Sequence, residues 1–287
     1  MKEILQFKKQ RDLGSMITDT FAFIRKNYKQ LFSIVLKTAG PALIIVVIAY
    51  IYYNKSVSSS MLGNTYFSEG LFVGNFFLAL AILLISGMVY NSLFYGTIIY
   101  YVKSYIENDG NVNSKEVISN VRKDFMKLLG LSFLVTLMVG FGFLLCGIPG
   151  IYFIVVLSPV YCVLIFEKRG ATDSISHCFD LIKGNWWITF ATLFVMGIIY
   201  YIVLLIFQIP QIIYYFIKAF TVFQEASLDP SQMFDWVYVA LSSFSVIAQN
   251  LLISVIVICT VFIYFDLNEK KNSTGAIETI ESLGKRD

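Results

Sequence analysis

Long hydrophobic runs dominate the chain, and six of them are long enough to cross a lipid bilayer as helices. A membrane-spanning helix needs about 20 mostly apolar residues. The six segments that meet this length are Leu31–Tyr53, Gly74–Val102, Leu128–Gly147, Ile148–Phe166, Trp186–Gln208 and Trp236–Phe265. The motif Gly147-Ile148-Pro149-Gly150 separates the third from the fourth. Because proline cannot continue helical hydrogen bonding and glycine favours turns, this motif predicts a tight hairpin.

Three polar segments that precede hydrophobic runs show apolar residues at helical spacing. The apolar faces comprise Leu13, Ile17, Phe21, Ile24 and Tyr28, then Val117, Val121, Phe125 and Leu128, and finally Ile175, Phe179, Ile182 and Trp186. Phe21–Tyr28 and Phe179–Trp186 share the pattern Phe-x-apolar-Ile-basic-x-Asn-aromatic, and Val121–Phe125 is a looser copy. Asn113 with Glu116 fits a capping box that opens the second segment. These patterns indicate an internal repeat.

The predicted fold class is therefore all-α. We expect a polytopic membrane protein with six transmembrane helices arranged as three hairpins, each preceded by a cytoplasmic amphipathic helix. The chain is interpreted as one integral membrane domain over residues 1–287. Within it, residues 1–30 are an amphipathic segment, 31–265 a six-span bundle and 266–287 a cytoplasmic tail. Since a polar segment of about thirty residues precedes the first run, we expect a retained anchor rather than a cleaved signal peptide.

Composition supports this fold class. Of the 287 residues, 57% are hydrophobic and 14% are charged, and the mean hydropathy is +0.71. Soluble domains carry about 25% charged residues. The composition therefore argues against a soluble enzyme, a disordered chain and a disulfide scaffold.

The distribution of Lys and Arg predicts the orientation. These residues concentrate in the N-terminal segment, in the loops after the second and fourth spans, and in the C-terminal tail. The opposite side carries only Lys55 and Lys218. We therefore expect both termini to lie in the cytoplasm. The apolar segment Ile209–Phe223, with Pro210 near its start, is too short for a separate span. It is predicted to be an interfacial helix or a kinked extension of the fifth span.

Polar residues within the spans are the candidates for functional contacts, because polar groups are costly in lipid. The candidates are Asn91 in the second span and Gln249 and Asn250 in the sixth. Amides at such a depth tie helices together by hydrogen bonds or bind a substrate. Small residues at positions 132, 136 and 140, and at 142, 146 and 150, predict close helix packing. His177 is expected to be solvated on a polar helix face.

Signatures of enzymes and of cofactor sites are missing from the sequence. There is no HExxH motif and no P-loop, and the chain has one histidine. The four cysteines show no CxxC spacing, so we expect neither a metal nor a redox role. Basic residues spread along membrane margins also argue against nucleic-acid binding. We expect no cofactor and a non-enzymatic protein.

Three groups of residues carry a resemblance to a known family. They are Phe7-Lys8 with Arg11–Gly14 and Ile17–Phe21 at the start, Gly147–Tyr152 at the fourth span, and Tyr264–Leu267 at the end of the sixth. Together they resemble a broad group of bacterial six-span proteins that includes the membrane domain of some glycerophosphodiester phosphodiesterases. Some proteins of this kind are labelled carotene oxygenase-like. The resemblance implies a six-span, multi-pass protein of a bacterial cytoplasmic (inner) membrane. It does not imply the activity of the phosphodiesterase catalytic domain, which has no counterpart here.

These observations favour an accessory or scaffold subunit of a cytoplasmic-membrane process. Its expected partners are the lipid bilayer and a protein at the cytoplasmic face. A transporter or a lipid-handling protein is the alternative.

Overall fold

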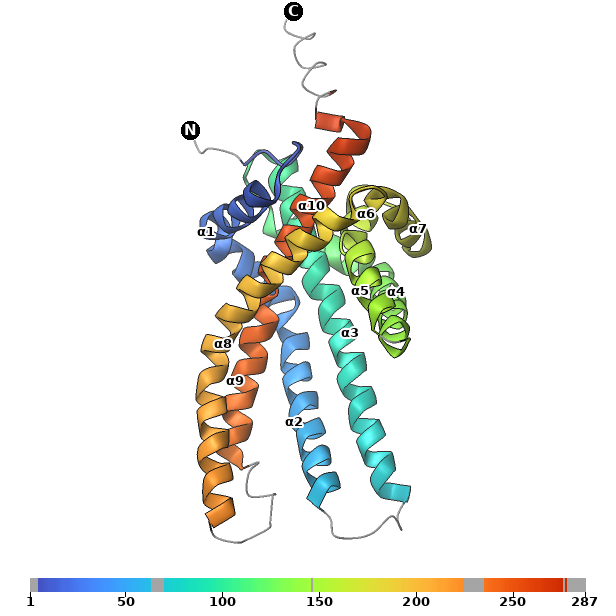
Figure 1. The fold of residues 1–287 in the computed structure, drawn as a ribbon. Coiled ribbons are helices and arrows are strands. Elements are labelled where there is room, and N and C mark those ends of the chain that lie inside the picture. Colours follow the sequence, from blue (N-terminus) through green and yellow to red (C-terminus); the bar gives the residue numbers. More distant parts are fainter. Residues whose placement is uncertain (1–4, 63–69, 146, 225–234, 276, 278–287) are drawn as a thin grey trace, which may run out of the picture. The chain divides into compact units, whose positions relative to one another are not determined.

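A computed structural model describes residues 5–62, 70–145, 147–224, 235–275 and 277, and its regular secondary structure consists of ten helices (Figure 1). The helices are α1 (Leu13–Thr38), α2 (Gly40–Leu62), α3 (Gly70–Glu107), α4 (Ser114–Leu144), α5 (Ile148–Leu157), α6 (Val160–Phe166), α7 (Ala171–Ile182), α8 (Trp186–Gln224), α9 (Trp236–Leu252) and α10 (Ser254–Asn272). No strand occurs among these residues.

Six helical stretches in the described part of the chain are long and apolar enough to cross a membrane. They are Gly40–Val57, Asn75–Glu107, Ser114–Leu144, Ile148–Phe166, Trp186–Thr221 and Trp236–Asn272. The predicted all-helical, six-span fold class is therefore confirmed. The stretch in α8 has 36 residues, which corresponds to about 54 Å at 1.5 Å per residue. Since the hydrocarbon core is about 30 Å thick, α8 must tilt or project beyond it.

The predicted start of the first span, at Leu31, is wrong. α1 runs through Leu31 to Thr38, and the apolar stretch of α2 begins at Gly40. Gly40-Pro41 explains the interruption, because the proline ring disfavours a continuous helix through the preceding turn. The N–H of Ala39 caps α1 by donating to the carbonyls of Val35 and Leu36.

Two further spans are interrupted where no interruption was predicted. The fourth consists of α5 and α6, which are separated at Ser158-Pro159, and the sixth consists of α9 and α10, which are separated at Ile253. By contrast, Ile209–Phe223 lies within α8, with Pro210 inside the helix. This segment is thus an extension of the fifth span, as one of the two alternatives predicted.

The chain divides into two compact units. Unit 1 comprises Met1–Ala39, Asn91–Ile198 and Ser254–Asp287, and unit 2 comprises Gly40–Tyr90 and Ile199–Ile253. Helices α3 and α8 contribute residues to both units. The prediction of one membrane domain stays a prediction.

In unit 1 the predicted hairpin between the third and fourth spans is present. α4 ends at Leu144 and α5 begins at Ile148, with Gly147 at a φ of 81°. A Cβ atom added to Gly142 would lie 2.7 Å from the Cα atom of Gly150. The helices therefore approach each other so closely that only glycine fits at Gly142. Gly140, the other glycine in the predicted packing stripes of α4, has no atom within 4 Å of such a Cβ, and Cys146 lies outside the described residues.

The core of unit 1 is aromatic where the segment before α1 packs against α1 and α10. The ring of Phe7 stacks on Phe262, with centroids 4.9 Å apart, and meets Phe23 edge-on at 5.5 Å. On α1 the core-facing residues include Met16, Phe23 and Leu31. This is not the apolar face expected from sequence, since Phe21 and Tyr28 on that face are 40% and 48% exposed. α1 therefore has one apolar face in the core and a second one that is only partly covered.

In unit 2, α2 packs against α9, and polar contacts join α8 to the start of α9. Asp235 caps α9 by accepting a hydrogen bond from the Tyr238 N–H at 3.0 Å. Its carboxylate also accepts a hydrogen bond from the Tyr214 hydroxyl and lies 3.0 Å from the Lys218 Nζ. Burial alone would raise the pKa of Asp235, but these three donors lower it to about 2. The contacts link the last part of α8 to the start of α9, and the segment that connects these helices, residues 225–234, lies outside the described residues.

The first prediction concerns the contact between α4 and α5. We expect Gly142→Ala to lower the stability of the protein by about 1–3 kcal/mol, because the methyl group overlaps backbone atoms that cannot move aside. Gly140→Ala is the matched control, and we expect it to be neutral or stabilising, since alanine favours helices. Thermal unfolding of both variants in detergent measures the difference. Equal stabilities would contradict the close packing.

The second prediction concerns the pH dependence of unit 2. The carboxyl pKa of Asp235 falls from 3.8 to about 2 on folding, so its stabilising contribution is complete above about pH 4 and is lost as the pH falls through 2. Asp235→Asn retains a capping side chain but removes the charge. We expect this variant to unfold more readily than wild type at pH 6, with a difference that shrinks towards pH 2. A difference that grows on acidification would contradict the assignment.

Candidate functional site

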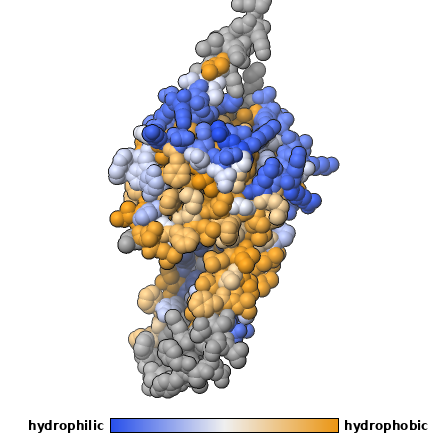
Figure 2. Space-filling view, turned by 90° about the vertical axis from the view of Figure 1, so that its right-hand side faces the viewer, coloured by the Kyte–Doolittle hydropathy of each residue, from blue (hydrophilic) through white to orange (hydrophobic). Residues whose placement is uncertain are grey.

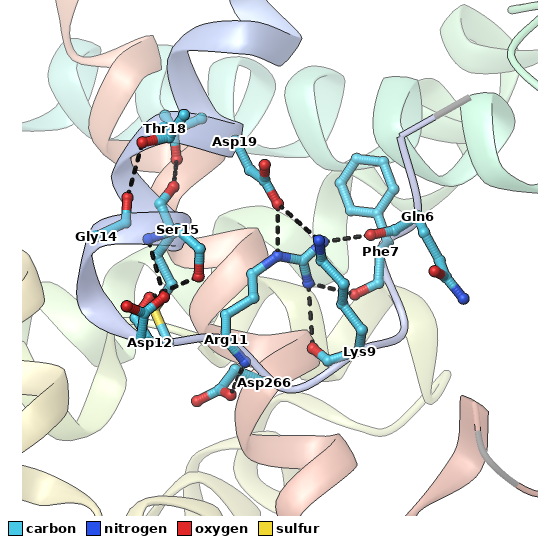
Figure 3. A network of polar contacts seen from close by, with 12 residues as sticks. Gln6, Phe7, Lys9, Arg11, Asp12, Gly14, Ser15, Thr18, Asp19 and Asp266 are labelled. Carbon is cyan, nitrogen blue, oxygen red and sulfur yellow. Dashed lines mark hydrogen bonds and ion pairs between the residues drawn. The ribbon is translucent and has the colours of Figure 1, made fainter. Parts of the chain in front are cut away.

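The strongest polar cluster in unit 1 surrounds Arg11, and we call it the Arg11 cluster (Figure 3). It comprises Gln6, Phe7, Lys9, Arg11, Asp19 and Asp266. The segment before α1 curls around the guanidinium group, so that the group meets α1 on one side and α10 on the other. The side chain of Arg11 is fully buried.

Hydrogen bonds satisfy the guanidinium. Its Nε donates to the carboxylate of Asp19 at 2.9 Å. Its Nη1 donates to the carbonyls of Phe7 at 2.6 Å and Lys9 at 3.2 Å, and its Nη2 donates to the carbonyl of Gln6. The guanidinium carbon also lies 4.8 Å from the ring centroid of Phe262, a cation–π distance. One buried charge thus provides the donors for three carbonyls of a segment without regular structure.

The carboxylate of Asp266 joins the two ends of the chain. Asp266 is 1% exposed and accepts the backbone N–H of Arg11 at 2.8 Å and the Nζ of Lys270 at 2.7 Å. Arg11 and Asp266 are 255 positions apart in the sequence. The Arg11 cluster therefore fixes the N-terminal segment against α10.

Burial of the guanidinium lowers the pKa of Arg11, and the hydrogen bond to Asp19 and the charges of Asp19 and Asp266 only partly offset this effect. Arg11 still stays protonated, because the intrinsic pKa of arginine is very high. A group that cannot release a proton is unsuited to general acid–base chemistry, so the cluster is interpreted as structural.

A second cluster lies where α6 meets α7 and α10. Glu167 follows α6 and accepts hydrogen bonds from the Arg169 Nε at 2.6 Å and the Tyr264 hydroxyl at 3.2 Å. The Nε2 of His177 lies 3.4 Å from the same carboxylate, and the His177 side chain is 15% exposed. The expectation of a solvated histidine is therefore wrong, because α7 turns His177 towards Glu167. The sequence offered no signal for this pairing, since Glu167 lies in the loop before α7.

The chemistry of the second cluster is limited. Burial raises the pKa of the neighbouring Cys178 thiol, and the charge of Glu167 raises it further. The thiol is thus neutral at physiological pH, and a neutral thiol is a poor nucleophile. Within the described ranges, no three His, Cys, Asp or Glu side chains are placed to hold a metal ion.

The structure places the three amide candidates separately. Asn91 belongs to unit 1 and has an exposed side chain. Gln249 and Asn250 belong to unit 2, where the Gln249 side chain is exposed and the Asn250 side chain donates to the carbonyl of Val246 at 2.8 Å. This bond lies within α9, so it does not join two helices.

Helices in unit 2 are joined instead through the backbone at the interruption of the sixth span. The Tyr90 hydroxyl donates to the carbonyl of Asn250 at 2.9 Å, and the Tyr200 hydroxyl lies 3.4 Å from the carbonyl of Gln249. Carbonyls in the last turn of a helix lack intrahelical partners, and an unsatisfied carbonyl in lipid is costly. Tyr90 satisfies such a carbonyl. The role of the amides of Asn91, Gln249 and Asn250 stays a prediction.

Charge is divided unequally between the units. All but two of the 22 Lys and Arg residues fall in unit 1 by position, and Lys55 and Lys218 are the two in unit 2. Figure 2 shows hydrophilic side chains gathered over the part of unit 1 that holds α7, beside a band of hydrophobic ones. Unit 1 therefore has a basic, polar end.

The third prediction tests the Arg11 cluster. Breaking a buried ion pair typically costs about 3–5 kcal/mol of stability. We expect Arg11→Gln to fall near the lower end of this range, because Asp19 keeps Lys9 as a partner. Arg25→Gln, at an exposed position of α1, is the control and is expected to have little effect. Thermal unfolding in detergent compares the two variants. If Arg11→Gln unfolded at the same temperature as the control, this result would contradict the structural role of the cluster.

Comparison with known proteins adds a family but no named relative. No curated protein and no solved structure matches the chain, and nothing links it to glycerophosphodiester phosphodiesterases or carotene oxygenases. A family profile matches residues 74–228, from the start of the second span to beyond α8. Because the match covers more than half of the 287 residues, the chain belongs to the uncharacterised protein family UPF0259.

Proposed function

We propose that the chain is a non-enzymatic, multi-pass protein of a bacterial cytoplasmic membrane and acts there as an accessory or scaffold subunit. In this proposal the basic end of unit 1 lies in the cytoplasm and is the docking surface for a protein partner. The unequal division of Lys and Arg between the two units carries the proposal, because positive residues are retained on the cytoplasmic side.

The Arg11 cluster supports the same orientation for both ends of the chain. Because Arg11 and Asp266 are bonded, the N-terminal segment and the end of α10 lie together in unit 1. A docking surface must also hold its shape, and the buried guanidinium fixes a segment that has no regular structure of its own. The surface of α4 adds exposed charges at Arg122 and Lys123.

The polar groups in unit 2 favour a scaffold over a transporter of ions. Among the described residues of unit 2, the charged ones are Lys55, Lys218 and Asp235, and the last two pair with each other. Proton and cation carriers use ionisable groups deep in their spans. One observation favours the alternative of transport or lipid handling, namely the interruption at Ile253, because interrupted helices form many transporter sites.

The fourth prediction tests orientation. Single cysteines at Lys183 in unit 1 and Lys55 in unit 2, both exposed, are treated with a membrane-impermeant maleimide in intact cells and after lysis. The unsubstituted chain is the blank, since its described cysteines are buried. We expect Lys55→Cys to react in intact cells and Lys183→Cys to react only after lysis. The reverse pattern would refute the proposed orientation.

The docking role is tested by native mass spectrometry of the gently extracted protein. We expect a stoichiometric protein partner that is lost in Arg122→Glu/Lys123→Glu and kept in the Lys55→Gln control. A specific lipid without any protein partner would favour lipid handling. Turnover of a lipid substrate by the purified protein would overturn the non-enzymatic assignment.

A further inference from the structure

A cavity of about 510 Å³ lies in unit 1 between the middle of α1 and the end of α3. α1 contributes residues 26–30 to its wall, and α3 contributes Tyr105. The turn formed by residues 109–112 closes the other side. The Gly110 N–H donates to the carbonyl of Tyr105 at 2.8 Å, and Gln30 donates to the carbonyl of Val112 at 3.0 Å, so the wall is held by hydrogen bonds.

The lining suits an anion. Lys26 and Lys29 contribute two positive charges and Asp109 contributes one negative charge, which leaves a net positive lining. Asn27 and Asn111 also line the cavity, and the Asn27 amide donates to the carbonyl of Phe23 within α1 at 3.0 Å. Lysine is a common phosphate ligand because its ammonium group is a compact charge with three donors.

The wall that α3 contributes belongs to the aromatic core of unit 1. Tyr105 is 1% exposed, and its ring centroid lies 6.1 Å from that of Phe7 and 5.2 Å from that of Phe23. Packing against these rings holds this side of the cavity in place.

The position of the cavity points to a lipid rather than a soluble anion. Tyr105 lies in the last turns of the apolar stretch Asn75–Glu107, where the spanning helix gives way to a polar turn. Tyr28 belongs both to the cavity wall and to the partly covered face of α1 with Phe21. A polar cavity that continues into an exposed apolar face matches a molecule with a charged head and hydrocarbon chains.

We propose that this cavity binds the phosphate of an anionic phospholipid, with Lys26 and Lys29 as its cationic ligands. The acyl chains lie along the face of α1 that carries Phe21 and Tyr28. The inference does not depend on the scaffold role, because a lipid can bind whether or not a protein docks on unit 1.

The fifth prediction tests this site with the full chain in a neutral detergent. Dioleoyl phosphatidylglycerol is added in increasing amounts, and native mass spectrometry counts the lipids that stay bound. We expect one phosphatidylglycerol to bind more tightly than phosphatidylcholine of the same chains. Lys26→Gln/Lys29→Gln should weaken this binding about thirtyfold, since each cation near a lipid phosphate contributes a factor of roughly five.

Two further variants give the test a direction and a control. Asp109→Asn removes the negative charge, and asparagine tolerates the positive φ of 47° at this position, so we expect it to tighten the binding of phosphatidylglycerol. Lys183→Gln/Lys271→Gln removes the same charge as the double lysine variant from exposed positions of unit 1 outside the cavity. We expect it to bind like wild type. Thermal unfolding of every variant shows that the protein is folded.

The competing explanations give different results. Equal weakening by both double variants would mean that net charge alone attracts the lipid, and would overturn the site. Binding of inorganic phosphate or glycerol phosphate without retention of phosphatidylglycerol would assign the cavity to a soluble anion. Loss of the protein partner with retention of the lipid would refute the scaffold role and leave this site intact.

Discussion

The buried guanidinium of Arg11 is the interaction on which the polar end of unit 1 depends. A charge removed from water is tolerated only when hydrogen bonds and opposite charges compensate for the lost hydration. Here Asp19 and three backbone carbonyls provide that compensation. The same carbonyls belong to a segment that has no helical hydrogen bonds of its own. The guanidinium and the segment therefore stabilise each other, and neither would hold this conformation alone.

The lipid environment explains the other polar contacts of the chain. Backbone groups in a membrane need partners within the protein. Where the sixth span is interrupted at Ile253, the Tyr90 hydroxyl provides one. Where α4 and α5 meet, Gly142 and Gly150 allow the backbones to approach, which replaces hydrophobic burial by close packing. Charged side chains are almost absent from unit 2 for the same reason.

Patterns that are local in sequence predicted the fold well. Apolar length was enough to find the spans, and Gly147–Gly150 marked a real turn. Asn113 caps α4 as its spacing with Glu116 suggested. Local patterns did not reveal features that are set by distant partners. Asp266 holds the backbone of Arg11 from 255 positions away. The inward turn of His177 depends on Glu167, and the core face of α1 depends on aromatic residues of other segments. Helical periodicity cannot distinguish the two apolar faces of α1, because both recur at similar spacing.

The candidate site was less predictable than the fold. The amide positions 249 and 250 were found because polar residues are rare in spans, but the groups that join helices there are backbone carbonyls. A backbone carbonyl carries no signal in a sequence. The cavity beside Lys26 was equally hidden, since it forms between segments that are about eighty positions apart.

Hydrogen exchange of the protein in lipid nanodiscs tests the central claim most directly. The claim is that residues 6–11, which lack regular structure, are as firmly held as the helices around them. We expect the Arg11 amide, which donates to Asp266 at 2.8 Å, to exchange as slowly as amides in the middle of α1. Exchange of that amide within seconds, at the rate of a free peptide, would contradict the account.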